Sequence, residues 1–220
     1  MSYQDFGKLG LGTTTEKLGI KLIVPLNSQE QYQCLTKEFL QKKTFTPSSI
    51  FQGEIKRGQH FYWTSDKRWE SIRKTRLIWP FLSEMEEHHS KLRVWEGASI
   101  NADATQDLVG EPDFCVTPNG FKPQAPYCIL VEAKQEDFNE GWGQALAVMK
   151  GSQIINEKQG KKMAVYGVVT TGDLWQFGKL QEEQFVIYPL GPISILKSDD
   201  TVIETLTLLD IIFTECEKNL

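Results

Sequence analysis

The segment YCILVEAK, residues 127–134, joins an apolar run to a glutamate and a lysine that lie two residues apart. Side chains alternate between the two faces of a β-strand, so Leu130, Glu132 and Lys134 are expected on one face. A run that is apolar on both faces predicts a strand covered on both sides, where a charged side chain is seldom left without a partner or a chemical task. The alternative is a weak ion pair at a strand end that emerges into solvent.

A second segment, GEPDFCV at residues 110–116, predicts the neighbouring strand. Asp113 begins this strand directly after Pro112, and the connection PNGFKPQAP carries the Asn-Gly pair and the prolines of a turn. Eighteen residues lie between Asp113 and Glu132, which is enough for one strand to end, turn and return as its own neighbour. We therefore expect the two carboxylates to lie next to each other on adjacent strand ends.

Two carboxylates in this position predict a site made of hard oxygen ligands. Mg²⁺ is typically held by one or two carboxylates and keeps several waters, so Asp113 and Glu132 suit it. A lysine held against such a site can orient or deprotonate a water, because neighbouring charges change its proton affinity. The sequence therefore indicates that Lys134 takes part in chemistry at this site.

The remaining hydrophobic periodicity predicts an α/β core with a mixed central sheet flanked by helices. Residues 1–12 indicate a loose leader, and residues 45–64, with proline, glycines and the aromatic cluster HFYW, indicate a strand or hairpin. Helices are predicted at residues 28–43 with a cap at Ser28, 66–89 with a kink or a restart at Pro80 that would divide it into two pieces, 138–154 with a cap at Asp137, and 201–217. Strands are predicted at residues 18–26, 92–100, 113–117, 127–134, 163–170, 174–177 and 185–188.

The pair PD at residues 112–113 and the triplet EAK at residues 132–134 resemble the signature of the PD-(D/E)XK nuclease superfamily, which includes restriction endonucleases and many repair nucleases. The superfamily's core of a helix, three strands, a helix and a strand is similar to the order predicted from about residue 74 to residue 169. By this resemblance the chain would have a restriction-endonuclease-like core. It would be a metal-dependent nuclease that hydrolyses phosphodiester bonds, with DNA as its partner and Mg²⁺, or Mn²⁺ as a substitute, as its cofactor.

The resemblance also implies roles for individual residues. Asp113 and Glu132 would bind the metal with the help of the backbone carbonyl of Ala133. Lys134 would position the attacking water. Many members of the superfamily carry a glutamine on the following helix near the site, and Gln144 is placed for that role.

Further candidates lie on the predicted helices. Many members of the superfamily bring an acidic residue from the first core helix, for which Glu84 is the candidate, with Glu87 close behind; a solvated helix face is the alternative for both. Basic residues are candidates for contacts with the nucleic-acid backbone, although ordinary solubilising charge explains any single one equally well. These basic residues are Lys67, Arg68, Arg73, Lys74 and Arg76 before the strands, and Lys158, Lys161 and Lys162 after the second helix.

Two alternatives to the nuclease stay open on the sequence. A nuclease-fold module that binds DNA or a partner protein without cutting would keep the motif without turnover. An unrelated α/β protein would carry EAK as a surface ion pair. A metal-dependent cleavage assay separates the first alternative from the nuclease, and the separation of Asp113 from Glu132 decides the second.

Composition sets the class of protein. The 220 residues are enough for one sizeable core, so we expect a single domain, with residues 1–70 as an N-terminal extension packed on the core, 71–180 as the nuclease-like core and 181–220 as a C-terminal strand and helix. With 24 basic and 29 acidic residues the net charge is −5, so a nucleic-acid-binding face must be a local patch. Four scattered cysteines, the lack of a signal peptide and the lack of a membrane-length apolar run predict a cytoplasmic protein without a membrane partner. A homodimer is compatible with this composition.

Overall fold

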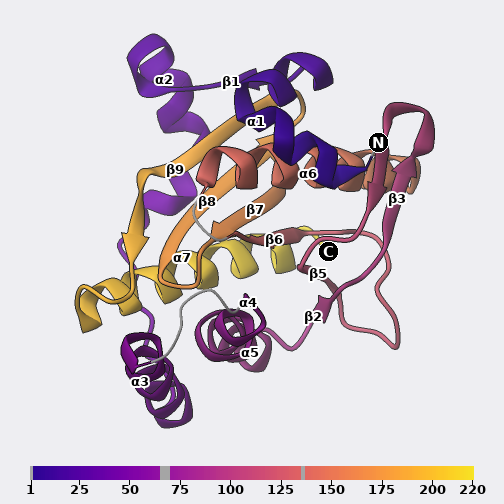
Figure 1. Cartoon of the computed structure of the whole chain (residues 1–220). Coiled ribbons are helices and arrows are strands. Elements are labelled where there is room, and N and C mark those ends of the chain that lie inside the picture. The colour runs from indigo at the N-terminus through magenta and orange to yellow at the C-terminus, as the bar shows by residue number, and fades with distance from the viewer. Residues whose placement is uncertain (1, 65–69, 135–136) are drawn as a thin grey trace.

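A mixed sheet of seven strands forms the centre of the computed structural model, which describes residues 2–64, 70–134 and 137–220 (Figure 1). The strands of this sheet are β1 (Lys21–Leu22), β2 (Leu92–Glu96), β5 (Phe114–Pro118), β6 (Ile129–Ala133), β7 (Val165–Thr170), β8 (Leu174–Gln181) and β9 (Gln184–Ser194). Their order in space is β1-β9-β8-β7-β6-β5-β2, with β6 parallel to β7 and antiparallel to β5. A separate ribbon pairs β3 (Ile100–Asp103) with β4 (Leu108–Gly110).

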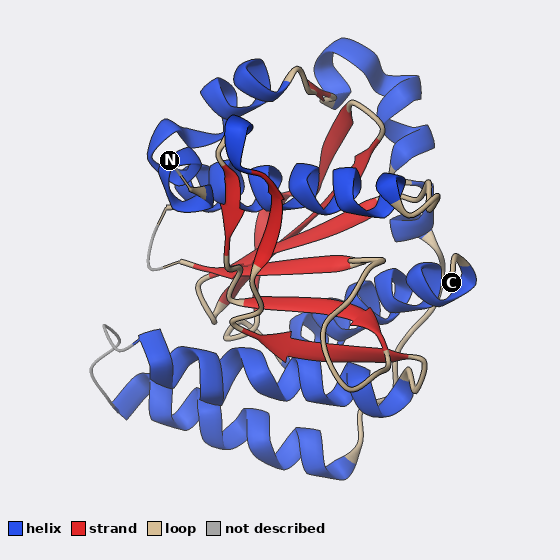
Figure 2. Ribbon diagram, turned by 90° about the vertical axis from the view of Figure 1, so that its right-hand side faces the viewer, coloured by secondary structure: helices blue, strands red, loops and turns tan. Residues whose placement is uncertain are grey.

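Helices cover both faces of this sheet (Figure 2). They are α1 (Tyr3–Leu18), α2 (Pro25–Leu35), α3 (Ser49–Thr64), α4 (Glu70–Arg73), α5 (Trp79–His88), α6 (Phe138–Lys158) and α7 (Asp199–Lys218), with 3₁₀ turns η1 (Lys37–Leu40) and η3 (Ala104–Gln106) and a π-helical segment η2 (Lys74–Ile78). Phe6 of α1 and Trp142 of α6 belong to the core on one face, and Phe81 of α5 and Phe213 of α7 belong to the core on the other. Within the described ranges no helix combines the length and the apolarity needed to cross a bilayer.

The strand β6 is buried on both faces, as its apolar run predicts. Ile129 and Val131 point into the core shared with α5 and α7, whereas Leu130 points into the core shared with α1 and α6. This alternation confirms the expected assignment of side chains to faces. It also places Glu132, two residues after Leu130, on the side of the sheet that α6 covers.

The chain between α5 and β7 follows the predicted order of a helix, three strands, a helix and a strand. Strands β2, β5 and β6 form an antiparallel meander, and α6 then crosses over to the parallel strand β7. The β3–β4 ribbon, which the sequence pattern did not reveal, is inserted between β2 and β5. Because β6 and β7 are parallel, their carboxyl ends lie at the same edge of the sheet, where α6 also begins.

The N-terminal part of the chain differs from the sequence expectations. Helix α1 replaces the expected loose leader, and helix α3 replaces the expected strand or hairpin. Glycines that suggest irregular structure serve instead for close packing between helices. A Cβ at Gly143 of α6 would collide with the carbonyl oxygen of Phe6, and one at Gly58 of α3 would collide with the carbonyl oxygen of Arg76.

Two prolines lie in the first turns of helices. Pro25, expected to interrupt a short strand, lies in the first turn of α2, and Pro80 lies in the first turn of α5, which agrees with the expected restart of a long helix. Proline is tolerated there because the first amides of a helix have no intrahelical partner. Ser28, expected to cap a helix, lies inside α2 with a non-helical backbone. The helix expected at residues 66–89 is formed by α4, η2 and α5 from residue 70 onwards, and residues 66–69 lie outside the described part of the chain.

Candidate active site

Asp113 stands at the start of β5, opposite Glu132 of β6. The antiparallel register pairs Phe114 with Val131, and its continuation by one residue brings the two acidic residues face to face. The Oδ2 atom of Asp113 accepts a hydrogen bond of 2.6 Å from the amide of Ala133. Its Oδ1 atom lies 2.5 Å from the Nζ atom of Lys74, on the π-helical segment η2. Thus the hairpin predicted from the turn sequence brings the two carboxylates together.

Glu132 carries a buried carboxylate that is only partly satisfied. Its residue is 1% exposed, and its Oε2 atom accepts a hydrogen bond of 2.9 Å from the Nε2 atom of Gln144. The other oxygen, Oε1, is buried and has no hydrogen-bond partner among the described residues. Burial raises the pKa of this carboxyl well above its usual range, and the charge of Asp113 raises it further, while Lys134 and Lys74 oppose the shift. The contacts of ionised Glu132, one hydrogen bond from Gln144 and the attraction of two lysines, therefore do not compensate for its burial and for the charge of Asp113.

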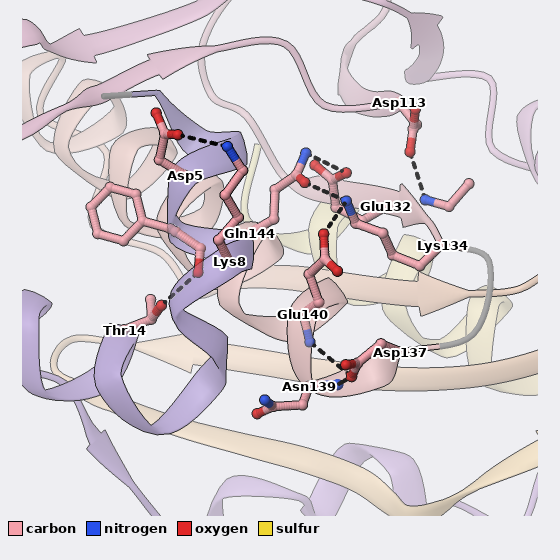
Figure 3. A network of polar contacts seen from close by, with 12 residues as sticks. Asp5, Lys8, Thr14, Asp113, Glu132, Lys134, Asp137, Asn139, Glu140 and Gln144 are labelled. Atoms are coloured by element: carbon pink, nitrogen blue, oxygen red, sulfur yellow. Dashed lines mark hydrogen bonds and ion pairs between the residues drawn. The ribbon is translucent and has the colours of Figure 1, made fainter.

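Gln144 links Glu132 to Lys134. Its Oε1 atom accepts a hydrogen bond of 2.6 Å from the Nζ atom of Lys134, while its amide nitrogen serves Glu132 (Figure 3). The Lys134 ammonium also lies 3.8 Å from a carboxylate oxygen of Glu140. Helix α6 begins directly after the site because the Asp137 side chain accepts hydrogen bonds from the amides of residues 139 and 140, which confirms the predicted cap. Its second turn then places Gln144 over the end of β6.

The backbone carbonyl of Ala133 faces the same place. Lys134 donates its backbone N–H to the carbonyl oxygen of Thr170 on β7 at 2.8 Å, whereas Ala133 donates its N–H to Asp113 on the opposite side. The N–H and the C=O of one residue in an extended strand point to the same side. The carbonyl oxygen of Ala133 is therefore directed toward Asp113, as expected for a third oxygen ligand.

These groups line one polar cavity of about 550 Å³. Helix α1, the segment before β5 and the start of α6 form its other walls. Figure 3 shows Lys8 of α1 and Gln144 of α6, which both line the cavity. The lining residues are Gln4, Lys8, Glu111, Asp113, Glu132, Ala133, Lys134, Asp137, Glu140 and Gln144. Five of them are acidic and two are basic, a formal charge of 2 − 5 = −3, so the cavity favours a cation.

The oxygen atoms of this cavity fit a divalent cation. Glu132 offers a buried oxygen without a hydrogen bond, Asp113 can accept more than the two contacts it has, and the Ala133 carbonyl supplies a neutral ligand. Mg²⁺ prefers such oxygen ligands and completes its shell with water. No cluster of three or more His, Cys, Asp or Glu side chains suited to a metal occurs in the described residues.

Glu84 does not join this site. Its residue is 4% exposed, and its two carboxylate oxygens accept hydrogen bonds from the amide and the hydroxyl of Ser48, at 2.6 and 2.7 Å. Ser48 precedes α3, and its hydroxyl in turn accepts from the amide of Phe51. Glu84 therefore fixes the start of α3 against α5, and the expectation that it is a metal ligand is corrected. Glu87 is exposed on α5.

The predicted nucleic-acid contacts divide into two groups. Lys74 contacts Asp113 directly, Arg76 is exposed on the same segment, and Arg73 is buried. Lys158 and Lys161 are at the other end of α6, about 30 Å from its first turn at 1.5 Å per residue. Lys158 contacts the backbone carbonyl of Ala102, Lys161 contacts that of Leu220, and Lys162 is exposed. The structure does not bring these three lysines to the carboxylate pair. Lys67 and Arg68 lie outside the described residues.

No pattern in the sequence predicts the contribution of α1 to the cavity. Gln4 and Lys8 belong to a segment rich in glycine and threonine, whose helical structure depends on contacts with α6. Glu140 lies three residues after the helix cap at Asp137, and Glu111 directly precedes the Pro-Asp pair, and neither is predicted as part of the site. The capping pattern itself is the signal that could have placed Asp137 and Glu140 beside Lys134.

No protein-family model matches the chain, and no curated protein matches it. What the site can do is therefore inferred from its own side chains. Two carboxylates beside a carbonyl offer ligands to a hard cation, and a lysine beside them can hold a water or a phosphate oxygen.

Proposed function

We propose that this protein is a nuclease that hydrolyses phosphodiester bonds with Mg²⁺, for which Mn²⁺ can substitute, and that its substrate is DNA. The observation that carries the proposal is the meeting of Asp113, Glu132 and Lys134 at one acidic cavity. Strand ends commonly carry weak ion pairs, but such pairs do not explain a buried carboxylate with an unsatisfied oxygen. A site that binds a cation explains it.

The arrangement of strands around the site supports the same proposal. The helix α5, the strands β2, β5 and β6, the helix α6 and the strand β7 resemble the core of the PD-(D/E)XK superfamily in their order of a helix, three strands, a helix and a strand. Residues 112–113 stand directly before β5, and Glu132 and Ala133 end β6 with Lys134 directly after it, so the two motif segments meet at one edge of the sheet.

Each residue of the site has a role in the proposed reaction. Asp113, Glu132 and the carbonyl of Ala133 would hold the cation, which when bound supplies Lewis-acid polarisation of the scissile phosphate. Lys134 would hold the attacking water in line with the phosphate. Gln144 keeps Lys134 and Glu132 in one geometry, because its amide group bonds to both.

The positive charges next to the cavity suit a nucleic-acid backbone. Lys8 extends from α1 with a side chain that is 75% exposed, and Arg76 is exposed on η2, near Lys74. Contacts of this kind hold phosphates without reading sequence. Because the whole chain is acidic, binding would depend on these few local contacts and should weaken as salt rises.

A second candidate is a nuclease-fold module that binds DNA or a protein without cutting. The ion pair between Lys74 and Asp113 favours it, because an ammonium group already neutralises one of the two carboxylates. In such a module the carboxylates and the lysines would form a structural network. The two candidates differ in whether a divalent cation activates the protein.

The test is cleavage of duplex DNA, single-stranded DNA and RNA by the wild type and by Asp113→Asn, with Mg²⁺, Mn²⁺ or Ca²⁺. We expect the wild type to cut with Mg²⁺ or Mn²⁺ and Asp113→Asn to lose cleavage, while its DNA affinity persists or rises as charge repulsion falls. Glu157→Gln, which removes one negative charge at the far end of α6, is the matched control and should cut normally. If the wild type binds one of these nucleic acids tightly but cuts none, the module is the correct function.

A further inference from the structure

The ammonium group of Lys74 forms an ion pair with the carboxylate of Asp113. Its Nζ atom lies 2.5 Å from Oδ1, and both side chains are about one-fifth exposed. Solvent screens ion pairs between fully exposed side chains and weakens them, but both of these side chains are mostly buried. The ammonium therefore supplies positive charge to a site that is otherwise rich in carboxylates.

The backbone around Lys74 holds this ammonium in place. Lys74 is the first residue of the π-helical segment η2, which continues from α4 into α5. Single π turns inside α-helices occur frequently at functional sites. Helix α3 packs closely against the same segment, since Gly58 leaves no room for a Cβ beside the carbonyl oxygen of Arg76. The segment thus cannot retreat from Asp113 without disturbing this contact.

A cation bound between Asp113 and Glu132 would meet the ammonium at close range. Like charges repel, and the repulsion is strong where water is partly excluded. The ion pair between Lys74 and Oδ1 of Asp113 would also be weakened, because the cation binds the same carboxylate. Both effects oppose cation binding, while neither affects the fold of the strands that carry the carboxylates.

We propose that Lys74 competes with the divalent cation for Asp113 and thereby lowers the affinity of the site for that cation. The ammonium neutralises Asp113 while the site holds no metal, and it turns from Oδ1 when a cation binds. This inference rests on the proposed function, because it requires that the cation binds at Asp113. Lys74 is in this sense a positioning residue whose effect passes through Asp113.

The test measures Mn²⁺ binding by isothermal titration calorimetry on protein freed of metal. Lys74→Met keeps the unbranched stem of the side chain and removes the charged terminal atom, Lys74→Arg keeps the charge, and Asp113→Asn removes the charge of the shared ligand. We expect Lys74→Met to bind Mn²⁺ on the order of tenfold more tightly than the wild type, given the strength of charge repulsion at partly buried sites. Lys74→Arg should stay near the wild type, and Asp113→Asn should lose binding.

A purely structural role for Lys74 would lower the unfolding temperature without increasing cation affinity. Equal or weaker Mn²⁺ binding by Lys74→Met, with measurable binding by the wild type, would overturn this inference and leave the proposed function intact. Absence of Mn²⁺ binding in both proteins would overturn both. Should Lys74→Met fail to fold, Lys74→Gln serves in its place, because it also lacks the charge and keeps a polar end.

Discussion

Glu132→Gln should make the metal-free protein more stable, although it removes a residue assigned to the site. The wild-type carboxylate is 1% exposed, and its Oε1 atom has no hydrogen-bond donor in the described part of the structure. Asp113 adds a second negative charge directly opposite. The substitution keeps the shape of the side chain and removes the charge, so the desolvation cost and the repulsion from Asp113 both decrease.

The size of the effect follows from the unsatisfied oxygen. Leaving a buried polar group without a partner costs about 1–3 kcal/mol, and more when the group is charged. Lys134 and Lys74 oppose part of this cost in the wild type. We therefore expect Glu132→Gln to raise the free energy of unfolding by about 1–2 kcal/mol, which corresponds to roughly 2–8 °C in the unfolding temperature of a chain of this size.

Urea unfolding of both proteins in EDTA measures this difference, and a repeat with Mg²⁺ should stabilise the wild type only. Glu38→Gln is the matched control, because the Glu38 carboxylate is also buried with one oxygen, Oε2, that has no hydrogen bond to the described residues, but its Oε1 atom lies 2.6 Å from the Lys179 ammonium and accepts from Tyr166 at 3.0 Å. Removing that charge should destabilise the protein by about 3–5 kcal/mol. A Glu132→Gln variant that is less stable than the wild type in EDTA would show that the Glu132 carboxylate is a structural partner, and the reasoning above would be refuted.

Three further changes test other parts of the structure. Lys134→Ala should abolish cleavage yet still bind Mn²⁺ in calorimetry, because the ligands are untouched; normal cleavage by the folded variant would contradict the role of the lysine. Glu84→Ala should lower the free energy of unfolding in urea by about 1–3 kcal/mol, because the hydrogen bonds to Ser48 are lost. Cleavage per folded molecule should not change, and loss of Mn²⁺ binding would show that Glu84 is a metal ligand after all. Gly58→Ala should destabilise by about 1–3 kcal/mol through overpacking against Arg76, and unchanged urea unfolding would disprove the close contact.

The strands of the site could be predicted because local rules determine them. Alternation along β6 fixes Glu132 and Lys134 on one face, whatever else the chain does. The Asn-Gly turn and the prolines between β5 and β6 favour the hairpin that brings Asp113 opposite Glu132. The cap at Asp137 starts α6 at a fixed distance from β6, so the position of Gln144 follows from sequence spacing as well.

The first 64 residues were harder to predict because their structure depends on distant partners. Glycine lowers intrinsic helix stability, so Gly7 and Gly10 of α1 and Gly58 of α3 suggested loops or turns. In the structure these helices are stabilised by the surfaces on which they pack, and at Gly58 the absence of a side chain is what permits the contact. The role of Glu84 was mispredicted for the same reason, since its partner Ser48 is 36 residues away. The ion pair of Lys74 likewise joins segments that no local pattern connects.

The packing of α1 on α6 has a consequence for the order in which the protein is made. The amide of Leu11 bonds to the side chain of Asn139 across 128 positions of the sequence. At a synthesis rate of about 5–20 residues per second, α1 waits roughly 6–25 s on the ribosome before that partner exists. Gln4 and Lys8 therefore reach the cavity late, and a nascent chain that lacks α6 has neither the wall formed by α1 nor Gln144 beside Lys134. Any activity that depends on this cavity is therefore absent until α6 has been synthesised.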